Sequence, residues 1–282
     1  MAAKDLDAYR GMNFEIAEAI APSWERRSAQ IEQVSAPGRE WLLRELQAQD
    51  GDKVLELAAG VGDTGFEAAA LVGDEGRLIS TDFSPAMLEA ARRRGAELGI
   101  KNVEYQVIDA ERMELDDDSV DRVICRFGYM LMADPAAALA ETRRVLRPGG
   151  RLVLAVWGAP ERNPFFTAIV GSMIQGGHLE PPDPDGPGMF SMADPKRTTA
   201  LLEGAGFSDV RCEEVPVRFE IPSLDEYMAL IADTAGPVAF ALRELSGADR
   251  DSVGRQAGAA LEPFAADGGY AIPGVVLCAA AG

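Results

Sequence analysis

A short apolar run that breaks into closely spaced glycines constrains the fold of this chain most strongly. Residues 54–57, with the sequence Val-Leu-Glu-Leu, have the length and composition of a buried parallel strand. Gly60, Gly62 and Gly65 follow, and helix-forming residues resume after them. Glycines allow a sharp turn and a close approach of a ligand to the backbone. The succession of strand, glycine turn and helix therefore predicts the first unit of a nucleotide-binding α/β sheet.

The spacing of these glycines fits two classes of cofactor. Gly60-x-Gly62-x-x-Gly65 satisfies the dinucleotide fingerprint. Glu56, at the end of the strand, separates the two classes, because a carboxylate there repels an anionic pyrophosphate. The same carboxylate favours the sulfonium and ammonium groups of S-adenosylmethionine, which has no phosphate. A solvated strand end is the simpler structural interpretation of Glu56.

Residues 54–62 resemble the first motif of class I S-adenosylmethionine-dependent methyltransferases, and most of all the small-molecule branch that includes the ubiquinone/menaquinone-type enzymes. Residues 141–158, ETRRVLRPGGRLVLAVWG, are a second strong match. Ala58 replaces the first glycine of the family motif, and we expect its methyl group to be tolerated if its φ is negative. The resemblance implies an α/β fold with a Rossmann-like seven-stranded mixed sheet in the order 3-2-1-4-5-7-6. Its last strand is antiparallel, and helical insertions form lids.

Further cofactor contacts follow from the ends of the later strands. Asp82 ends the second predicted strand, where a carboxylate accepts hydrogen bonds from two ribose hydroxyls. Phe83 and Met87 are placed to flank the adenine. By resemblance, Asp109 and the Ala110 amide meet the adenine edge. The predicted cofactor-binding residues are Glu56, Ala58, Gly60, Gly62, Asp82, Phe83, Met87, Asp109, Ala110 and Arg126.

Fewer residues are predicted to act on the molecule that accepts the methyl group than to bind the cofactor. Arg126 and Tyr129 follow the fourth predicted strand, at the edge where open α/β sheets bind ligands. Arg126 is a candidate for the cofactor carboxylate or an anionic substrate, with a surface arginine as the alternative. Tyr129 and His178, the only histidine, are the predicted catalytic residues. Glu111 is a third candidate base, and an exposed loop position is the simpler interpretation of His178. No metal site is predicted.

The segments around the predicted core carry apolar helical patterns. Pro22 is expected to end a first helix and Pro37 to begin a third, so that three short helices precede the core. Tyr9, Phe14 and Trp24 are candidates for a substrate wall, with core packing as the alternative. The predicted division is a lid (1–35), the core (36–160), an insertion (161–193), the sixth strand (194–220), a helical cap (221–270) and the last strand (271–282).

Composition limits the partners and the compartment. The net charge of −19 argues against nucleic acid and anionic membranes. No run is apolar enough to span a bilayer and no secretory signal is visible. Three widely spaced cysteines fit a reducing cytosol. We expect a cytoplasmic protein without membrane or nucleic-acid partners, with a homodimer as a candidate assembly.

These features predict an S-adenosylmethionine-dependent methyltransferase that modifies an O, N or C nucleophile of a small, largely apolar acceptor, such as a polyketide, quinone or phenol. One alternative is an NAD-dependent oxidoreductase that uses the same glycine turn. Glu56, Asp109 and the lack of a Tyr-x-x-x-Lys pair after the fourth strand argue against it. A second alternative is a non-catalytic S-adenosylmethionine-binding protein.

Overall fold

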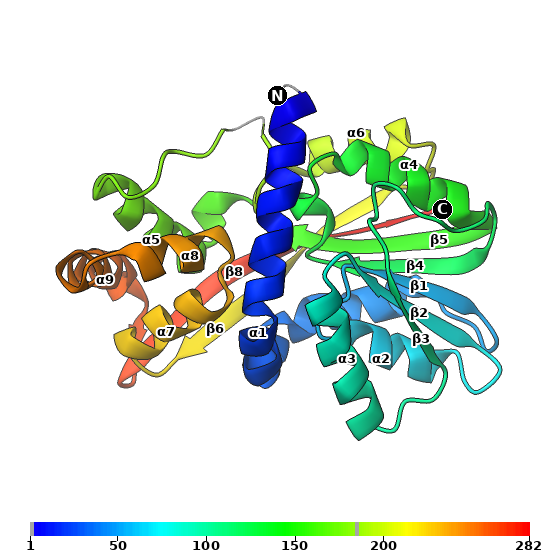
Figure 1. Ribbon diagram of the computed structural model, residues 1–282, viewed down its shortest axis with the longest axis horizontal. Coiled ribbons are helices and arrows are strands. Elements are labelled where there is room, and N and C mark those ends of the chain that lie inside the picture. The colour runs from blue at the N-terminus through cyan, green and yellow to red at the C-terminus, as the bar shows by residue number, and fades with distance from the viewer. Residues whose placement is uncertain (1–2, 184–185) are drawn as a thin grey trace.

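A single mixed sheet forms the centre of the molecule (Figure 1). The structure is a computed structural model that describes residues 3–183 and 186–282. The remaining positions belong to the predicted lid and insertion, and those parts of the two predictions lie outside the described residues. The parallel strands are β1 (Lys53–Leu57), β2 (Arg77–Asp82), β3 (Val103–Val107), β4 (Val120–Arg126) and β5 (Leu146–Trp157).

Two long antiparallel strands complete the sheet. β8 (Gly269–Ala281) pairs with β5 on one side and with β6 (Arg211–Ile221) on the other. The order β3-β2-β1-β4-β5-β8-β6 confirms the predicted order. The difference in numbering comes from β7 (Ala265–Ala266), a short strand that pairs with β8 and was not predicted. β5 begins at Leu146, which pairs with Val120 before a register shift.

Helices cover both faces of the parallel half (Figure 1). α2 (Asp63–Leu71) and α3 (Pro85–Glu97) lie on one face, and α4 (Pro135–Val145) and α6 (Pro195–Gly204) lie on the other. α3 and α4 each begin at a proline that follows a capping residue. The Ser84 hydroxyl accepts a hydrogen bond from the Met87 N–H, and Asp134 accepts one from the Ala137 N–H. A proline at the first position of each helix loses no helical hydrogen bond.

The N-terminal segment is a single helix, α1 (Ala3–Leu46), so the prediction of three helices is wrong. Pro22 and Pro37 lie inside α1, although an internal proline costs about 3 kcal/mol in helix propensity. Contacts along the length of α1 offset that cost, since it packs against α3, β5, β6 and other elements. The predicted boundary between lid and core at residues 35 and 36 therefore falls inside one helix.

The C-terminal segments build a cap beyond the end of β5. β6 pairs with β8 from Tyr270 to Ala280, whereas β5 pairs with β8 only from Val276 onward. The overhanging β6–β8 ribbon carries α5 (Pro164–Gln175), α7 (Leu224–Thr234), α8 (Pro237–Glu244) and α9 (Gly247–Leu261). Of the short helices, η2 (Pro160–Arg162) precedes α5 and η3 (Glu262–Phe264) follows α9, whereas η1 (Tyr129–Leu131) lies between β4 and α4. In Figure 1 the cap lies to the left, the parallel half to the right, and α1 between them.

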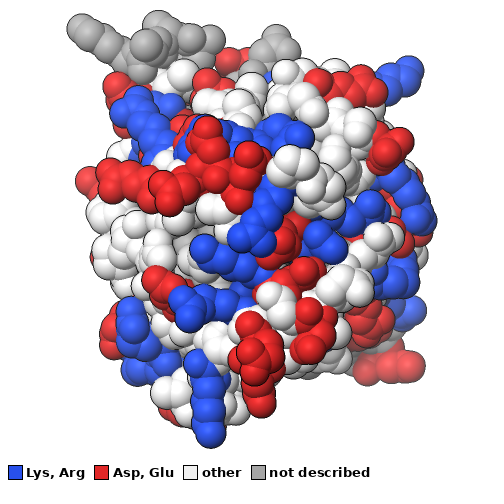
Figure 2. Space-filling model, turned by 90° about the vertical axis from the view of Figure 1, so that its right-hand side faces the viewer, with Lys and Arg blue, Asp and Glu red and all other residues white. Residues whose placement is uncertain are grey.

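The surface carries both signs of charge. On the face shown in Figure 2, acidic and basic side chains interleave despite the net charge of −19. Arg144, for example, forms ion pairs with Asp117 and Glu141. None of the helices in the described part of the chain is both long and apolar enough to cross a membrane.

Candidate functional site

The glycine turn joins β1 to α2 in left-handed backbone conformations. Gly60 and Gly62 have φ values of 55° and 92°. A Cβ on Gly62 would lie 2.4 Å from the Phe66 ring, whereas a Cβ on Gly60 would meet no atom within 4 Å. Ala58 has a φ of 52°, so the condition of a negative φ is not met. A left-handed alanine costs roughly 1–2 kcal/mol, and such strain is often found at functional sites.

Glu56, in β1, holds the glycine turn through hydrogen bonds of its side chain. Its Oε1 accepts a 2.7 Å hydrogen bond from the Gly65 N–H, and its Oε2 accepts a 3.0 Å bond from the Ser80 hydroxyl. Only 3% of Glu56 is exposed, so the alternative of a solvated strand end is wrong. Burial raises the pKa of Glu56 to about 8, against the hydrogen bonds that lower it. The geometry thus makes Glu56 a support of the turn, and its direct contact with a cofactor stays a prediction.

Asp82 connects the glycine turn to the start of α3. Its Oδ2 accepts a 2.9 Å hydrogen bond from the Gly60 N–H, and its Oδ1 accepts one of 2.9 Å from the Ser84 N–H. Each carboxylate oxygen retains a second lone pair for a ligand hydroxyl. Burial raises the pKa of Asp82 to about 6. The structure therefore brings the predicted ribose acid directly onto the predicted turn.

α1 brings a further acid to this point, which sequence reasoning missed. Glu18 accepts hydrogen bonds from the Ser84 hydroxyl, at 2.6 Å, and from the Ala86 N–H, at 3.0 Å. Glu18 thus caps α3 beside Asp82, where the positive end of a helix favours a carboxylate. No local signal in the sequence points to this contact, because 66 residues separate Glu18 from Ser84.

The residues predicted to contact the adenine lie in two places. One is the loop after β3, and the other is the surface that packs against α1. Asp109 is exposed and accepts a 2.9 Å hydrogen bond from the Glu111 N–H, so its carboxylate stands at the surface of this edge. The Phe83 ring meets the Phe14 ring edge-on, with centroids 5.9 Å apart. Met87 is buried and packs in a cluster with Ile16 of α1.

Glu111 is not free to act as a base. Its carboxylate forms an ion pair with Arg10 of α1 and accepts a 2.8 Å hydrogen bond from the Ala133 N–H. Asn13 adds a second link between α1 and this loop, since it donates a 2.8 Å hydrogen bond to the Leu131 carbonyl. These contacts hold the first turns of α1 over the carboxyl edge of the sheet.

Arg126 contacts α1 in this structure. Its guanidinium forms an ion pair with Glu32 and donates a hydrogen bond to the Ser35 hydroxyl. Only 11% of the Arg126 side chain is exposed, which excludes the alternative of a surface arginine. Arg126 lies at the end of β4 next to the glycine turn, because Cys125 pairs with Leu57 of β1.

Tyr129 and His178, the two predicted catalytic residues, lie in different parts of the structure. Tyr129 is fully buried, and its hydroxyl lies 2.6 Å from the Thr142 hydroxyl. Burial raises the pKa of Tyr129 well above its ordinary value, so the phenol is held neutral and its placement does not support a catalytic role. His178 follows α5, in the cap, and its backbone N–H donates to the Met173 carbonyl. A catalytic role for His178 stays a prediction.

The wall candidates on α1 have different surroundings. Trp24 donates a 3.3 Å hydrogen bond from its indole N–H to the Thr234 carbonyl of α7, which ties α1 to the cap. Tyr9 is half-buried, and burial raises its pKa. Phe14 remains 39% exposed beside Phe83. Among these three residues, Phe14 presents the most surface to a ligand.

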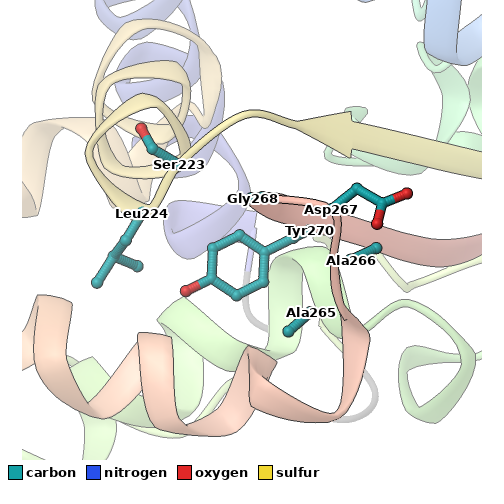
Figure 3. A pocket seen from close by; sticks show the side chains of 8 residues that line it. Ser223, Leu224, Ala265, Ala266, Asp267, Gly268 and Tyr270 are labelled. Atoms are coloured by element: carbon teal, nitrogen blue, oxygen red, sulfur yellow. The ribbon is translucent and has the colours of Figure 1, made fainter.

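Two open hollows are lined by residues other than Asp82. One, of about 550 Å³, lies between the β7–β8 hairpin and the start of α7, where the Tyr270 ring faces Leu224 (Figure 3). The other, of about 400 Å³, runs along α2 from Glu32 and Asp63 to Ile100. Within the described residues, no group of three or more His, Cys, Asp or Glu side chains is placed to hold a metal ion.

The residues that the fold brings together fit an adenosine carrying a cationic side chain. Asp82 offers two acceptor oxygens for adjacent hydroxyls, and the open space over Gly60 allows close approach to the backbone. A pyrophosphate is disfavoured at the start of α2, because Asp63 lies in the first turn of that helix and Glu56 already accepts a hydrogen bond from the Gly65 N–H there. This donor set fits S-adenosylmethionine better than a dinucleotide.

Comparison with known proteins supports the same conclusion. Residues 33–169 match the ubiE/COQ5 methyltransferase family. A demethylmenaquinone methyltransferase of Clavibacter sepedonicus is 42% identical over 110 residues, which are 39% of this chain and 43% of that relative. The ubiquinone/menaquinone biosynthesis C-methyltransferase UbiE of Coxiella burnetii is 32% identical over 45% of this chain and 51% of its own length. The chain thus spans about half or less of the length of these relatives.

A solved structure extends the likeness of the fold beyond the matched segment. A SAM-dependent methyltransferase from Aquifex aeolicus has a TM-score of 0.53 and 24% identity, covering 69% of this chain and 92% of its own. The predicted Rossmann-like fold and the predicted resemblance are therefore confirmed. Residues 33–169 are thus similar to the ubiE/COQ5 methyltransferase family.

Proposed function

We propose that the protein transfers a methyl group from S-adenosylmethionine to an O, N or C nucleophile of a small, largely apolar molecule. The observation that carries this proposal is the junction of Asp82 with the Gly60 N–H, within the segment that matches the ubiE/COQ5 family. The names of the two relatives favour a quinone-like acceptor and a carbon nucleophile. Within the class of small apolar acceptors, we regard a quinone or a phenol as the first to test.

The chemistry requires little from the chain beyond positioning. Bound S-adenosylmethionine supplies a methyl group on a sulfonium: the methyl–sulfur bond breaks, its electron pair stays on sulfur, and the nucleophile forms the new bond. Asp82 and the glycine turn hold the adenosine part, and α1 covers the same edge through Glu18 and Arg10. A site that excludes water and holds both reactants contributes orientation and desolvation. A lid movement of α1 and a homodimer both stay predictions.

A proton must leave the nucleophile when it is a hydroxyl, a protonated amine or a C–H acid. Glu111 and Tyr129 have their polar atoms bonded within the protein, so neither offers a free base in this arrangement. His178 remains a candidate base if α5 closes toward the core. A phenolate or an enolate that arrives already deprotonated needs no base from the protein.

Ligand-induced stabilisation tests the proposal against the oxidoreductase alternative. S-adenosylhomocysteine should raise the melting temperature, because a ligand that binds the native state stabilises it, and NAD and NADP should not. Transfer of a labelled methyl group to a panel of quinones and phenols then separates an enzyme from a non-catalytic binding protein. Stabilisation by NAD alone would overturn the proposed function.

A further inference from the structure

A column of aromatic rings runs from the end of β4 into the cap. The Phe127 ring stacks on Trp157, with centroids 4.5 Å apart and planes 12° apart, and Trp157 meets Phe219 at 6.0 Å. Phe219 stacks in turn on Phe165, which meets the Tyr227 ring of α7 edge-on. The four rings beyond Phe127 are buried, whereas Phe127 itself is half-buried. The accessible end of this aromatic column is therefore Phe127.

Phe127 lies at the carboxyl edge of the sheet, close to the glycine turn. It follows Arg126, the last residue of β4, and its N–H donates a 2.7 Å hydrogen bond to the Ala155 carbonyl of β5. The next residue, Gly128, packs against the turn, since a Cβ on Gly128 would lie 2.6 Å from the Ala58 Cβ. The accessible end of the aromatic column is thus one residue removed from a direct contact with the turn.

The backbone of Phe127 is strained. Its φ is 61°, in the left-handed region, where a bulky side chain is an outlier and a glycine is not. Among the residues that the structure describes, Phe127 is the one aromatic residue with a positive φ. Strain of this kind persists at ligand-binding sites, where a side chain is retained for a purpose other than stability. The strain therefore indicates a functional role for the Phe127 ring.

The loop before α6 brings a second half-buried ring to the same group. The Ser191 hydroxyl donates a 2.9 Å hydrogen bond to the Met130 carbonyl of η1. The neighbouring Phe190 ring meets Phe166 at 6.4 Å, and Phe166 meets Trp157 at 4.7 Å. The space next to the aromatic column is therefore bordered by rings, which offer a planar ligand stacking partners and an aliphatic ligand only contact area.

We propose that Phe127 selects and positions the methyl acceptor, by stacking against a planar aromatic ring of that molecule at the accessible end of the aromatic column. This inference rests on the proposed function, and it narrows the acceptor from small apolar molecules to planar aromatic ones. Stacked or edge-on ring pairs contribute to binding beyond the area that they bury. Because Trp157 packs on the Phe127 ring, that ring is already oriented before the acceptor binds.

Calorimetry with two matched ligands tests the stacking. 2-Naphthol is planar and aromatic, and decahydro-2-naphthol has the same carbon skeleton and hydroxyl without aromaticity. Burial of apolar area alone favours the saturated compound, which is the more apolar of the two. In the presence of saturating S-adenosylhomocysteine, we expect the unmodified protein to bind naphthol more tightly than its saturated analogue.

Substitutions of Phe127 then locate the contact. Phe127→Gly should fold, because glycine adopts a φ of 61° without strain, and it should reduce the affinity ratio between the two ligands by about 2- to 10-fold. Phe127→Leu, which keeps an apolar side chain, should reduce the ratio similarly, whereas Phe127→Tyr should retain it. Affinity for S-adenosylhomocysteine should change little in the three variants.

The matched control is Phe264→Leu. Phe264, in η3, is also a half-buried phenylalanine but lies outside the aromatic column, so its substitution should leave the ratio unchanged. The inference is overturned if the unmodified protein does not bind naphthol or does not prefer it to the saturated analogue. A ratio unaffected by both Phe127→Gly and Phe127→Leu, or reduced equally by Phe264→Leu, would overturn it too. Failure of the unmodified protein to bind S-adenosylhomocysteine would instead overturn the proposed function.

Discussion

The carboxyl edge of the parallel half and the cap use different chemistry to hold their shape. At the edge, buried carboxylates such as Asp82 and Glu56 accept hydrogen bonds from backbone N–H groups of the adjacent turns. In the cap, aromatic rings pack on one another: Phe165 stacks on Phe219 with centroids 3.9 Å apart. Tyr227 meets the edge of Phe165 and donates a 2.7 Å hydrogen bond to its carbonyl.

This difference separates ligand recognition from packing. Hydrogen bonds to buried acids are directional and specify one class of ligand, whereas aromatic contacts stabilise through buried area and tolerate varied shapes. Trp157 marks the boundary between the two regions, because it ends β5 and its ring stacks on Phe127, at 4.5 Å, and meets Phe219, at 6.0 Å. We expect changes at the edge to alter cofactor affinity and changes in the cap to alter stability.

The largest expected effect is on the cap. Phe219→Ala removes the ring that Phe165 stacks on and leaves a cavity, and it should lower the free energy of unfolding by about 3–5 kcal/mol. Chemical denaturation gives that value, and calorimetry should show an unchanged affinity for S-adenosylhomocysteine. A Phe14→Ala control, at a ring that is 39% exposed, should cost far less stability. If Phe219→Ala reduces the free energy of cofactor binding as much as the free energy of unfolding, the cap and the carboxyl edge do not act independently.

Substitutions of Asp82 test whether changes at the carboxyl edge alter cofactor affinity. Asp82→Ala should weaken binding of S-adenosylhomocysteine by roughly 1–3 kcal/mol, since two hydroxyls lose a charged acceptor. Asp82→Asn should cost less, because the amide oxygen still accepts. Asp121→Ala is the control: Asp121 also accepts a backbone hydrogen bond, from Lys53, but at the opposite end of β1 and β4. Equal affinities in the Asp82 variants and the unmodified protein would remove Asp82 from the site.

Glu56 predicts a pH dependence of stability. Its pKa is about 8 in the folded protein and near the ordinary value of 4.5 in the unfolded chain. Between these values the folded state binds more protons, so the free energy of unfolding falls as the pH rises, on the order of 1 kcal/mol per pH unit. Urea denaturation from pH 5 to pH 8 should show a shallower fall for Glu56→Gln. Parallel curves for the two proteins would contradict the buried, protonated Glu56.

The smallest expected effect concerns the strained alanine of the turn. Ala58→Gly relieves a φ of 52° and should stabilise the fold by about 0.5–1 kcal/mol. Ala59→Gly is the control, because Ala59 is not among the described residues with positive φ and should lose stability through added unfolded-state entropy. Melting curves of the two variants should therefore shift in opposite directions. A loss of stability in both would show that the Ala58 side chain contributes packing that outweighs the strain.

Sequence alone determined the parallel half of this protein. The glycine spacing, the apolar run before it and Asp82 at the next strand end predicted the turn and the candidate ribose acid, whereas the strand order was implied by the family resemblance. These features are local, because a strand, a turn and a helix start depend on residues only a few positions apart. Ala58 is the exception. Nothing in the sequence indicates that the turn requires a left-handed backbone conformation at this alanine.

Only the tertiary structure decided how α1 completes the site. Glu18 reaches Ser84, Arg10 reaches Glu111 and Glu32 reaches Arg126 across 66 to 101 residues. Such pairs carry no periodic or compositional signal, so the sequence predicts that Pro22 ends one helix and Pro37 begins another. The physical reason is that contacts along α1 outweigh the local cost of two prolines, and tertiary packing overrides helix propensity when a long helix is held along its length.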